Sequence, residues 1–258
     1  MANFGAIGRK YGWKRSLPDF RDHKFAVPAH LVAAPLPPSV DLRPKMPAPY
    51  DQSELGSCTA NATGGLAHYL FIKEGKPAYV PSRLFIYYNE RVLEDSVNED
   101  SGASLRDGMK VLNKQGAPHE TIWPYCIKKF KTRPPKAAYA DGLNHLLVKY
   151  ESVDNTKVDL MKAALAAGYP IAGGFSVYES FESDAVAKTG IVPMPGKDDS
   201  ALGGHAILVV GYDDAKKWYI VRNSWGSGWG DKGYFYMPYD FFSNPDLADD
   251  FWVGKLIK

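Results

Sequence analysis

Residues 203–230, GGHAILVVGYDDAKKWYIVRNSWGSGWG, carry the clearest structural pattern in the chain. One strand-like apolar run begins at His205, and a second ends immediately before Asn223. Turn-forming residues at 213–216 separate the two runs and predict a hairpin. The hairpin would place Asn223 beside His205, where the amide oxygen can orient one ring N–H and leave the other nitrogen for a nucleophile. Taken singly, the two residues are better explained as a structural histidine and a turn former.

The second half of the chain continues in this β-type pattern. A helix is predicted over residues 156–167, with Thr156 and Asp159 as a capping box and Gly168 as its stop. The predicted strands are residues 171–177, 205–212, 218–222 and 234–237.

The first half of the chain is helical in pattern. From Cys58 onward, apolar residues recur at helical spacing at positions 62, 66, 69 and 70. Pro81 begins a second predicted helix, and a third is expected between a Ser104 cap and a stop at Gly116. Helices followed by strands indicate an α+β protein with two lobes.

Composition is that of an ordinary globular protein. Of 258 residues, 45% are hydrophobic and 23% are charged, and the formal net charge is +2. Neither a nucleic acid nor a membrane partner is therefore expected, and the basic run at 128–133 is interpreted as a solvated loop. No apolar run approaches the ~20 residues that span a bilayer, and no signal peptide is visible. The protein is expected to be soluble, either cytoplasmic or exported by another route.

Two cysteines are too few for a disulfide framework. Cys58 stands at the start of the first predicted helix, where free N–H groups and the helix dipole favour an anion. This placement is expected to lower the pKa of the thiol and to favour a thiolate nucleophile. The alternative is a small buried hydrophobe, which is also the interpretation of Cys126. No zinc-type spacing or Walker-type loop occurs, so no metal or organic cofactor is expected.

Taken together, the motifs resemble those of the papain-like cysteine peptidases. His205 and Asn223 follow Cys58 by about 150 and about 165 residues, near the roughly 130–150 typical of that family. Gln52 stands six positions before Cys58, where the family has its oxyanion-hole glutamine. Further matching stretches are Pro38-Ser-Val-Asp41-Leu-Arg43, Trp123-Pro-Tyr125, residues 203–212 and residues 223–230.

This resemblance covers about residues 38–258 and implies a two-lobed α+β fold. A helical lobe over about 39–148 and a β-rich, barrel-like lobe over about 149–258, with crossing termini, would enclose an active-site cleft. The implied function is a cysteine endopeptidase acting on peptide or protein substrates without a cofactor.

The resemblance also implies roles for the motif residues. Cys58 would attack the scissile carbonyl, His205 would protonate the leaving amine, and Asn223 would orient His205. Gln52 and the Cys58 backbone N–H would stabilise the oxyanion. The implied substrate-binding positions are Ser101, Gly102, Gly174, Gly203, Ala206 and Trp225. The small residues Gly174, Gly203 and Ala206 predict a roomy pocket for the second residue before the scissile bond, which favours bulky apolar side chains such as Leu or Phe.

The sequence departs from the family pattern at two positions around the nucleophile. Leu55 replaces the usual Cys, and Thr59 replaces the usual Trp. Two other functions remain open: a catalytically silent relative that binds peptides or another ligand, and an amidase or acyl transferase that uses the same triad. The sequence leaves open the physiological substrate, endo- versus exopeptidase action, the oligomeric state and the compartment.

Residues 1–38 are predicted to form an extended N-terminal segment, because prolines disfavour regular structure there and the aromatic residues need burial. Gly12-Trp13 and residues 17–22 resemble an N-terminal motif of some microbial papain-like proteins. One hypothesis is that the segment lies in the cleft as a prosegment, with Val27-Pro28 and Ala34-Pro35 guarding against self-cleavage. The alternative, equally open, is a strap that stabilises the two lobes.

Overall fold

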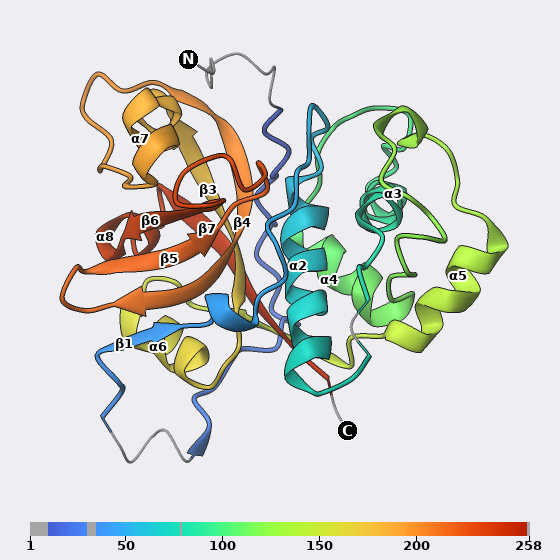
Figure 1. Cartoon of the computed structure of the whole chain (residues 1–258), viewed down its shortest axis with the longest axis horizontal. Helices are drawn as coiled ribbons and strands as arrows, with labels where there is room; N and C mark the ends of the chain where they lie inside the picture. Colours follow the sequence, from blue (N-terminus) through green and yellow to red (C-terminus); the bar gives the residue numbers. More distant parts are fainter. Residues whose placement is uncertain (1–9, 30–34, 78, 257–258) are drawn as a thin grey trace.

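The chain folds into two lobes, and its N-terminal segment passes between them. The computed structural model describes residues 10–29, 35–77 and 79–256. Helices α2 to α5 form one lobe, and the sheet with α6 to α8 forms the other (Figure 1). The dark blue trace of residues 10–29 runs between the two. The α+β class and the two-lobed architecture expected from the sequence are confirmed.

The β-rich lobe is built on one antiparallel seven-stranded sheet, in the order β2-β7-β3-β4-β5-β6 with β1 paired to β4. The predicted hairpin is present as β4 and β5, although β4 begins at Ala201 rather than at His205. The strands are β1 (Ser39–Asp41), β2 (Lys149–Val153), β3 (Ile171–Tyr178), β4 (Ala201–Asp213), β5 (Trp218–Arg222), β6 (Tyr234–Pro238) and β7 (Ala248–Lys255).

In the first lobe α3 and α4 pack against α2, and α6, α7 and α8 border the sheet. Short 3-10 turns lie at Arg43–Lys45, Ile127–Lys129, Leu143–His145 and Glu179–Glu182. The helices are α2 (Cys58–Lys73), α3 (Arg83–Leu93), α4 (Leu105–Lys114), α5 (Lys136–Gly142), α6 (Val158–Ala166), α7 (Asp184–Thr189) and α8 (Tyr239–Phe242).

Helix α2 joins the two lobes and is buried along nearly its whole length. A Cβ at Gly65 would lie 2.7 Å from Nη1 of Arg222 in β5, and one at Gly64 would lie 3.5 Å from Ile86 in α3. Glycine disfavours an isolated helix by about 1 kcal/mol. Here the two glycines allow the sheet and α3 to approach the helix closely, which compensates for that weakness.

The predicted helix ends are partly correct. Ser104 caps α4 by accepting a hydrogen bond from the Asp107 backbone N–H at 3.2 Å. The capping box predicted at Thr156 is wrong, because the Thr156 hydroxyl donates to Asp154 at 2.6 Å and α6 begins only at Val158. The side chain of Asp154 competes for the hydroxyl that would otherwise cap the helix.

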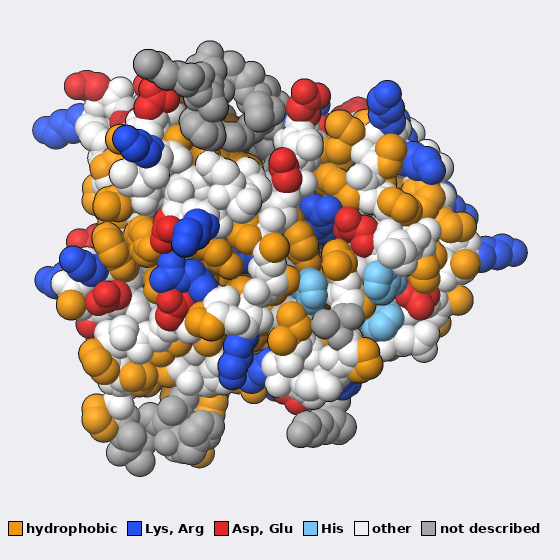
Figure 2. Space-filling view, in the orientation of Figure 1, with side chains coloured by type: hydrophobic (Ala, Val, Ile, Leu, Met, Phe, Trp, Pro, Cys, Tyr) orange, Lys and Arg blue, Asp and Glu red, His pale blue; other side chains and the backbone are white. Residues whose placement is uncertain are grey.

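The described residues form two hydrophobic cores, one within the β-rich lobe and one between the helices and the sheet. Aromatic side chains such as Phe175 and Phe235 fill the β-rich core, while Leu66 and Leu112 belong to the core shared by α2, α4 and the back of the sheet. Acidic and basic side chains are interspersed over the face shown in Figure 2. Within the described residues, no helix is both long and apolar enough to cross a membrane.

Candidate active site

Cys58 is the first residue of α2, and its side chain is fully buried. Backbone N–H groups of Ala206, Gly12 and Thr59 hydrogen-bond to the thiol. Ala206 directly follows His205 in β4. The packing of α2 against β4 therefore brings the candidate nucleophile to the strand that carries the candidate base, although the two residues are far apart in sequence.

Burial raises the pKa of the Cys58 thiol to about 11. The N–H groups of Ala206 and Gly12 act in the opposite direction, and the nearby Glu90 adds to the increase. The lowered pKa expected from the helix start is therefore wrong for the buried thiol. The loss of water around the sulfur outweighs the favourable helix end.

His205 and Asn223 are hydrogen-bonded to each other across the β4–β5 hairpin. Nε2 of His205 lies 2.9 Å from Oδ1 of Asn223, and both side chains are buried. Oδ1 can only accept, so the ring hydrogen is assigned to Nε2, and Nδ1 is then the basic nitrogen of the neutral ring. This arrangement holds the imidazole in one orientation and one tautomer.

Aromatic side chains enclose the imidazole. Trp225 stacks on His205 with ring centroids 5.0 Å apart, and Phe175 contacts the ring edge-on at 5.8 Å. Trp229 packs against Trp225 at 4.9 Å. These apolar surroundings exclude water and strengthen the bond between His205 and Asn223. Trp225 thus covers the histidine, and its ring also faces Tyr11 of the N-terminal segment, with centroids 6.4 Å apart.

Gln52 is buried and fixed by a residue that the sequence analysis missed. Its side-chain Oε1 accepts a 2.6 Å hydrogen bond from the Ser224 hydroxyl. Its Nε2 donates to the backbone oxygen of Leu55 at 3.0 Å and to that of Lys10 at 3.4 Å. The position of Ser224 next to Asn223 is the one sequence signal that could have indicated its role.

Residues 10–14 occupy the groove between the lobes as an extended strand. The Trp13 N–H donates to the Gly204 oxygen at 2.9 Å, and the Gly12 oxygen accepts from the Ala103 N–H at 2.8 Å. Trp13 and Ala103 form a parallel bridge. The segment is therefore hydrogen-bonded to the helical lobe on one side and to β4 on the other.

This segment covers three glycines that were expected to bind substrate, namely Gly102, Gly174 and Gly203. A Cβ at Gly174 would lie 1.9 Å from the indole of Trp13, and one at Gly102 would lie 2.0 Å from the Gly12 oxygen. No side chain fits into contacts this close, so these glycines create the space that the segment occupies.

The other two expected substrate-binding positions have different surroundings. The hydroxyl of Ser101 bonds to Ser96 and to the backbone oxygen of Gly102. Ala206 is buried and reaches Cys58 through its backbone N–H. Among the described residues, no side-chain hydrogen bond joins Ser101 to the N-terminal segment, and the methyl group of Ala206 can form none.

Ion pairs fasten the segment to the helical lobe, and a short backbone ladder fastens it to β2. The Phe25 N–H donates to Ser152 at 2.8 Å, and the Phe25 ring is buried. The ion pairs are Lys10 with Asp100 at 2.9 Å, Lys14 with Glu94 at 2.8 Å and Arg106 with Asp22 at 2.7 Å.

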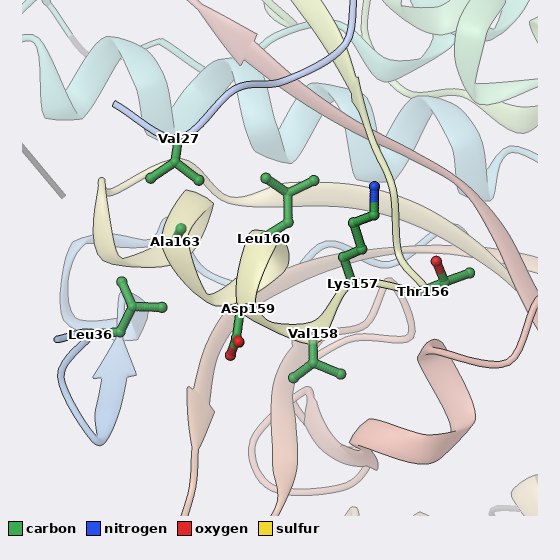
Figure 3. Close-up of a pocket in the computed structure, with 8 residues that line it drawn as sticks. All are labelled: Val27, Leu36, Thr156, Lys157, Val158, Asp159, Leu160 and Ala163. Atoms are coloured by element: carbon green, nitrogen blue, oxygen red, sulfur yellow. The ribbon is translucent and has the colours of Figure 1, made fainter. Parts of the chain in front are cut away.

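The prolines expected to guard the cleft do not lie in it. Val27 and Leu36 border a separate pocket of about 690 Å³ beside α6, shown in Figure 3, and none of the expected site residues lines it. Ala34 falls outside the described residues. The guard hypothesis is therefore wrong for Val27-Pro28, because the residue beside the thiol is Gly12.

Comparisons with known proteins agree with this geometry. Residues 36–249 match the family model described as papain family cysteine protease. A peptidase C1-like protein of Acanthamoeba polyphaga mimivirus is 43% identical over 270 residues, covering 96% of this chain and 87% of the relative.

Solved structures show the same fold. Xylellain, a cysteine protease from Xylella fastidiosa, matches with a TM-score of 0.90 and 42% identity, and the match covers 97% of each chain. Digestive procathepsin L 3 of Tenebrio molitor matches with a TM-score of 0.71 and 17% identity, covering 98% of this chain and 78% of that one. At this lower identity the likeness concerns the fold.

Proposed function

The chain belongs to the papain family of cysteine proteases, and we propose that Cys58, His205 and Asn223 are the catalytic triad of a peptidase closed by its own N-terminal segment. That it is a cysteine peptidase follows from its family. The observation that supports the triad most directly is the buried 2.9 Å bond between His205 and Asn223, on a strand whose next residue, Ala206, contacts the Cys58 thiol.

In the proposed mechanism, the Cys58 sulfur bonds to the scissile carbonyl carbon while His205 takes the thiol proton. His205 then gives that proton to the leaving amine nitrogen as the C–N bond breaks, which leaves an acyl-enzyme. Water, deprotonated by the same imidazole, releases the acid and restores the thiol. Asn223 keeps the ring oriented throughout these steps.

We assign Gln52 to the oxyanion that forms at the carbonyl. Its Nε2 group points toward the groove, where it donates to the Lys10 backbone oxygen. Donors fixed in advance stabilise developing negative charge without reorganising. The Cys58 backbone N–H would be the second donor.

We propose that the N-terminal segment inhibits the enzyme by occupying groups that a substrate would use. Lys10 presents a carbonyl to Gln52, and Gly12 presents an N–H to the Cys58 thiol. A tethered segment acts at an effective concentration near ~1 mM, so modest contacts keep it in place. This arrangement favours the prosegment hypothesis over a strap, because the contacts centre on the candidate catalytic groups.

The test is turnover of a fluorogenic dipeptide by the full-length protein, with and without a thiol-alkylating epoxide. We expect Cys58→Ala to abolish turnover and Cys126→Ser, the matched control, to retain it. Hydrolysis that persists in purified Cys58→Ala would refute the mechanism. A wild-type protein that binds peptides without cleaving them would favour the silent relative, and transfer to an added amine in preference to water would favour an acyl transferase.

A further inference from the structure

The two candidate oxyanion donors come from separate stretches of the chain. Gln52 lies in an extended stretch that is bonded to the loop after β5, through its N–H to the backbone oxygen of Ser224 at 2.9 Å. Cys58 instead begins helix α2. Two donors stabilise one oxyanion only if both point at the same position. A side chain that holds both stretches would therefore set the geometry of the candidate site.

Arg83, the first residue of α3, is bonded to both stretches. Its Nη1 donates to the backbone oxygen of Asp51 at 3.1 Å and to Oδ1 of Asn61 at 3.0 Å. Nδ2 of Asn61 in turn donates to the backbone oxygen of Ser57 at 2.9 Å. Asp51 and Ser57 are the residues that directly precede the two candidate donors. One nitrogen of Arg83 thus connects the backbone on which each donor is carried.

The guanidinium of Arg83 is itself held in one orientation. Its side chain is buried, and Nε and Nη2 form a two-pronged ion pair with Glu120, at 3.0 and 2.9 Å. The group also lies over the rings of Tyr50 and Tyr125, at 4.6 and 4.0 Å from their centroids. A planar fork that is paired and stacked in this way loses little further freedom when it binds another oxygen.

Tyr125 forms a second connection between the same two stretches. Its hydroxyl donates to the backbone oxygen of Gln52 at 2.9 Å and lies 2.5 Å from the Ser57 hydroxyl. Because its one hydrogen is used on Gln52, the Ser57 hydroxyl is the donor to Tyr125. The ring of Tyr125 also supports the Arg83 guanidinium, so the two side chains act together.

We propose that Arg83 is a positioning residue of the reaction, which holds Gln52 and the Cys58 backbone N–H at the separation that one oxyanion requires. Arg83 acts through these two donors, with Tyr125 as its second contact, and not on the substrate itself. The inference rests on the proposed peptidase function. A catalytic group misplaced by about 1 Å can cost about 10²-fold in rate. Because the oxyanion develops only in the transition state, a loosened connection should lower kcat and leave KM nearly unchanged.

The test is Arg83→Lys in the full-length protein. Lysine keeps a positive charge for Glu120, but a single nitrogen cannot replace a fork that serves the carboxylate and two oxygens at once. We expect kcat for a fluorogenic dipeptide to fall by about 10- to 100-fold, with KM within about threefold of the wild type. The rate at which a small reagent alkylates Cys58 should stay within about twofold, because alkylation forms no oxyanion.

Arg91→Lys is the matched control. Arg91 is buried in the same helix and also bonds to backbone oxygens, which belong to residues outside the two stretches, namely Tyr87, Val97, Glu99 and Phe130. Its kcat should stay within about twofold of the wild type. A fall in kcat of the same size in both lysine variants, or an unchanged kcat in Arg83→Lys, would overturn the inference.

A double variant separates positioning from a general weakening of the fold. In Gln52→Ala only one donor remains, so the relative placement of two donors no longer matters. Adding Arg83→Lys should then lower kcat by no more than about threefold further. A fall of full size in both backgrounds would contradict the inference. Should Arg83→Lys fail to fold, Tyr125→Phe decides, since it should lower kcat at constant KM, and an unchanged kcat would count against the proposal.

A last measurement does not depend on turnover. If the wild type cleaves no peptide, the proposed peptidase function fails, but the connection can still be followed by amide hydrogen exchange. The N–H of Gln52 and that of Asn61, which donates to the Ser57 oxygen at 3.0 Å, report on the two stretches. Both should exchange about tenfold faster in Arg83→Lys and at the wild-type rate in Arg91→Lys. Wild-type exchange in Arg83→Lys would show that it does not hold the stretches together.

Discussion

The hydroxyl of Ser224 donates a 2.6 Å hydrogen bond to Oε1 of Gln52, and both side chains are buried. Ser224 adjoins Asn223, and the backbone oxygen of Ser224 also accepts from the Gln52 N–H at 2.9 Å. These bonds tie the candidate oxyanion donor to the loop that holds the candidate imidazole partner. With Oε1 fixed, the amide N–H groups of Gln52 face the Lys10 carbonyl at 3.4 Å.

Gln52→Ala is expected to lower kcat by roughly 10²- to 10³-fold, or about 2.7–4 kcal/mol of transition-state stabilisation. The reason is that the variant loses a donor already aimed at the position of the developing oxyanion. The measurement is steady-state hydrolysis of a fluorogenic peptide by the full-length protein. Gln115→Ala, at the far end of α4, serves as the matched control. A near-wild-type kcat in Gln52→Ala would remove Gln52 from the oxyanion site.

Gly12→Ala should open the groove without changing its walls. A Cβ at Gly12 would lie 1.8 Å from the backbone oxygen of Gly56, so the segment cannot keep its present path. Overpacking of this kind costs roughly 1–3 kcal/mol, which corresponds to an increase in kcat/KM of roughly 5- to 150-fold.

The same variant allows a direct check with a matched control. Gly196→Ala adds a methyl group where no atom lies within 4 Å, and it should leave kcat/KM unchanged. If Gly12→Ala folds and is no more active than the wild type, the segment is a strap and not an inhibitor.

The reactivity of Cys58 should depend on pH in a way that reports on closure. Burial raises the thiol pKa to about 11, and only the thiolate is alkylated. In the full-length protein, the alkylation rate should therefore rise steadily between about pH 7 and about pH 10, without levelling off. In Gly12→Ala, water reaches the sulfur, the pKa falls and the rate should level off at lower pH.

This measurement is best made in a Cys126→Ser background, so that labelling reports on one thiol. A full-length protein whose alkylation rate is already constant below about pH 9 would contradict the closed, protonated thiol.

Helices α2, α3, α4 and α6 and the β4–β5 hairpin could be predicted because their signals are local, whereas the short helices α5, α7 and α8 were not predicted. The apolar run after His205 and the Ser104 cap depend on neighbours within a few positions. Strands β2 and β7 were missed, since Glu151 in one strand and Asp249-Asp250 in the other interrupt the apolar pattern. Pairing with β3 and burial in the core stabilise β7 despite these charges. Tertiary context thus decided what local propensity could not.

The candidate site, like the fold, could be predicted only where its signals are local. The motifs around Cys58, His205 and Asn223 singled out the candidate triad, but they contain no information about what lies across the groove. That Gly12 meets the thiol depends on backbone contacts between distant segments. The position of Asp250 depends on a bulge and a positive φ that no local pattern shows.

Glu90 provides a test of stability that does not involve the groove. Its side chain is fully buried in α3, where one oxygen accepts a 2.9 Å hydrogen bond from Thr59, and burial raises its pKa well above the usual value. The folded protein therefore keeps a proton that the unfolded chain releases above about pH 4.3, so this group lowers the free energy of unfolding as the pH rises past that value.

Glu90→Gln keeps the acceptor for Thr59 and has no proton to lose. We expect its free energy of unfolding in urea to exceed that of the wild type at about pH 7, with the difference disappearing near about pH 4. In the exposed control Glu54→Gln, the difference in free energy of unfolding from the wild type should be the same at both pH values. If Glu90→Gln also shows the same difference at both pH values, the buried carboxyl is not held protonated.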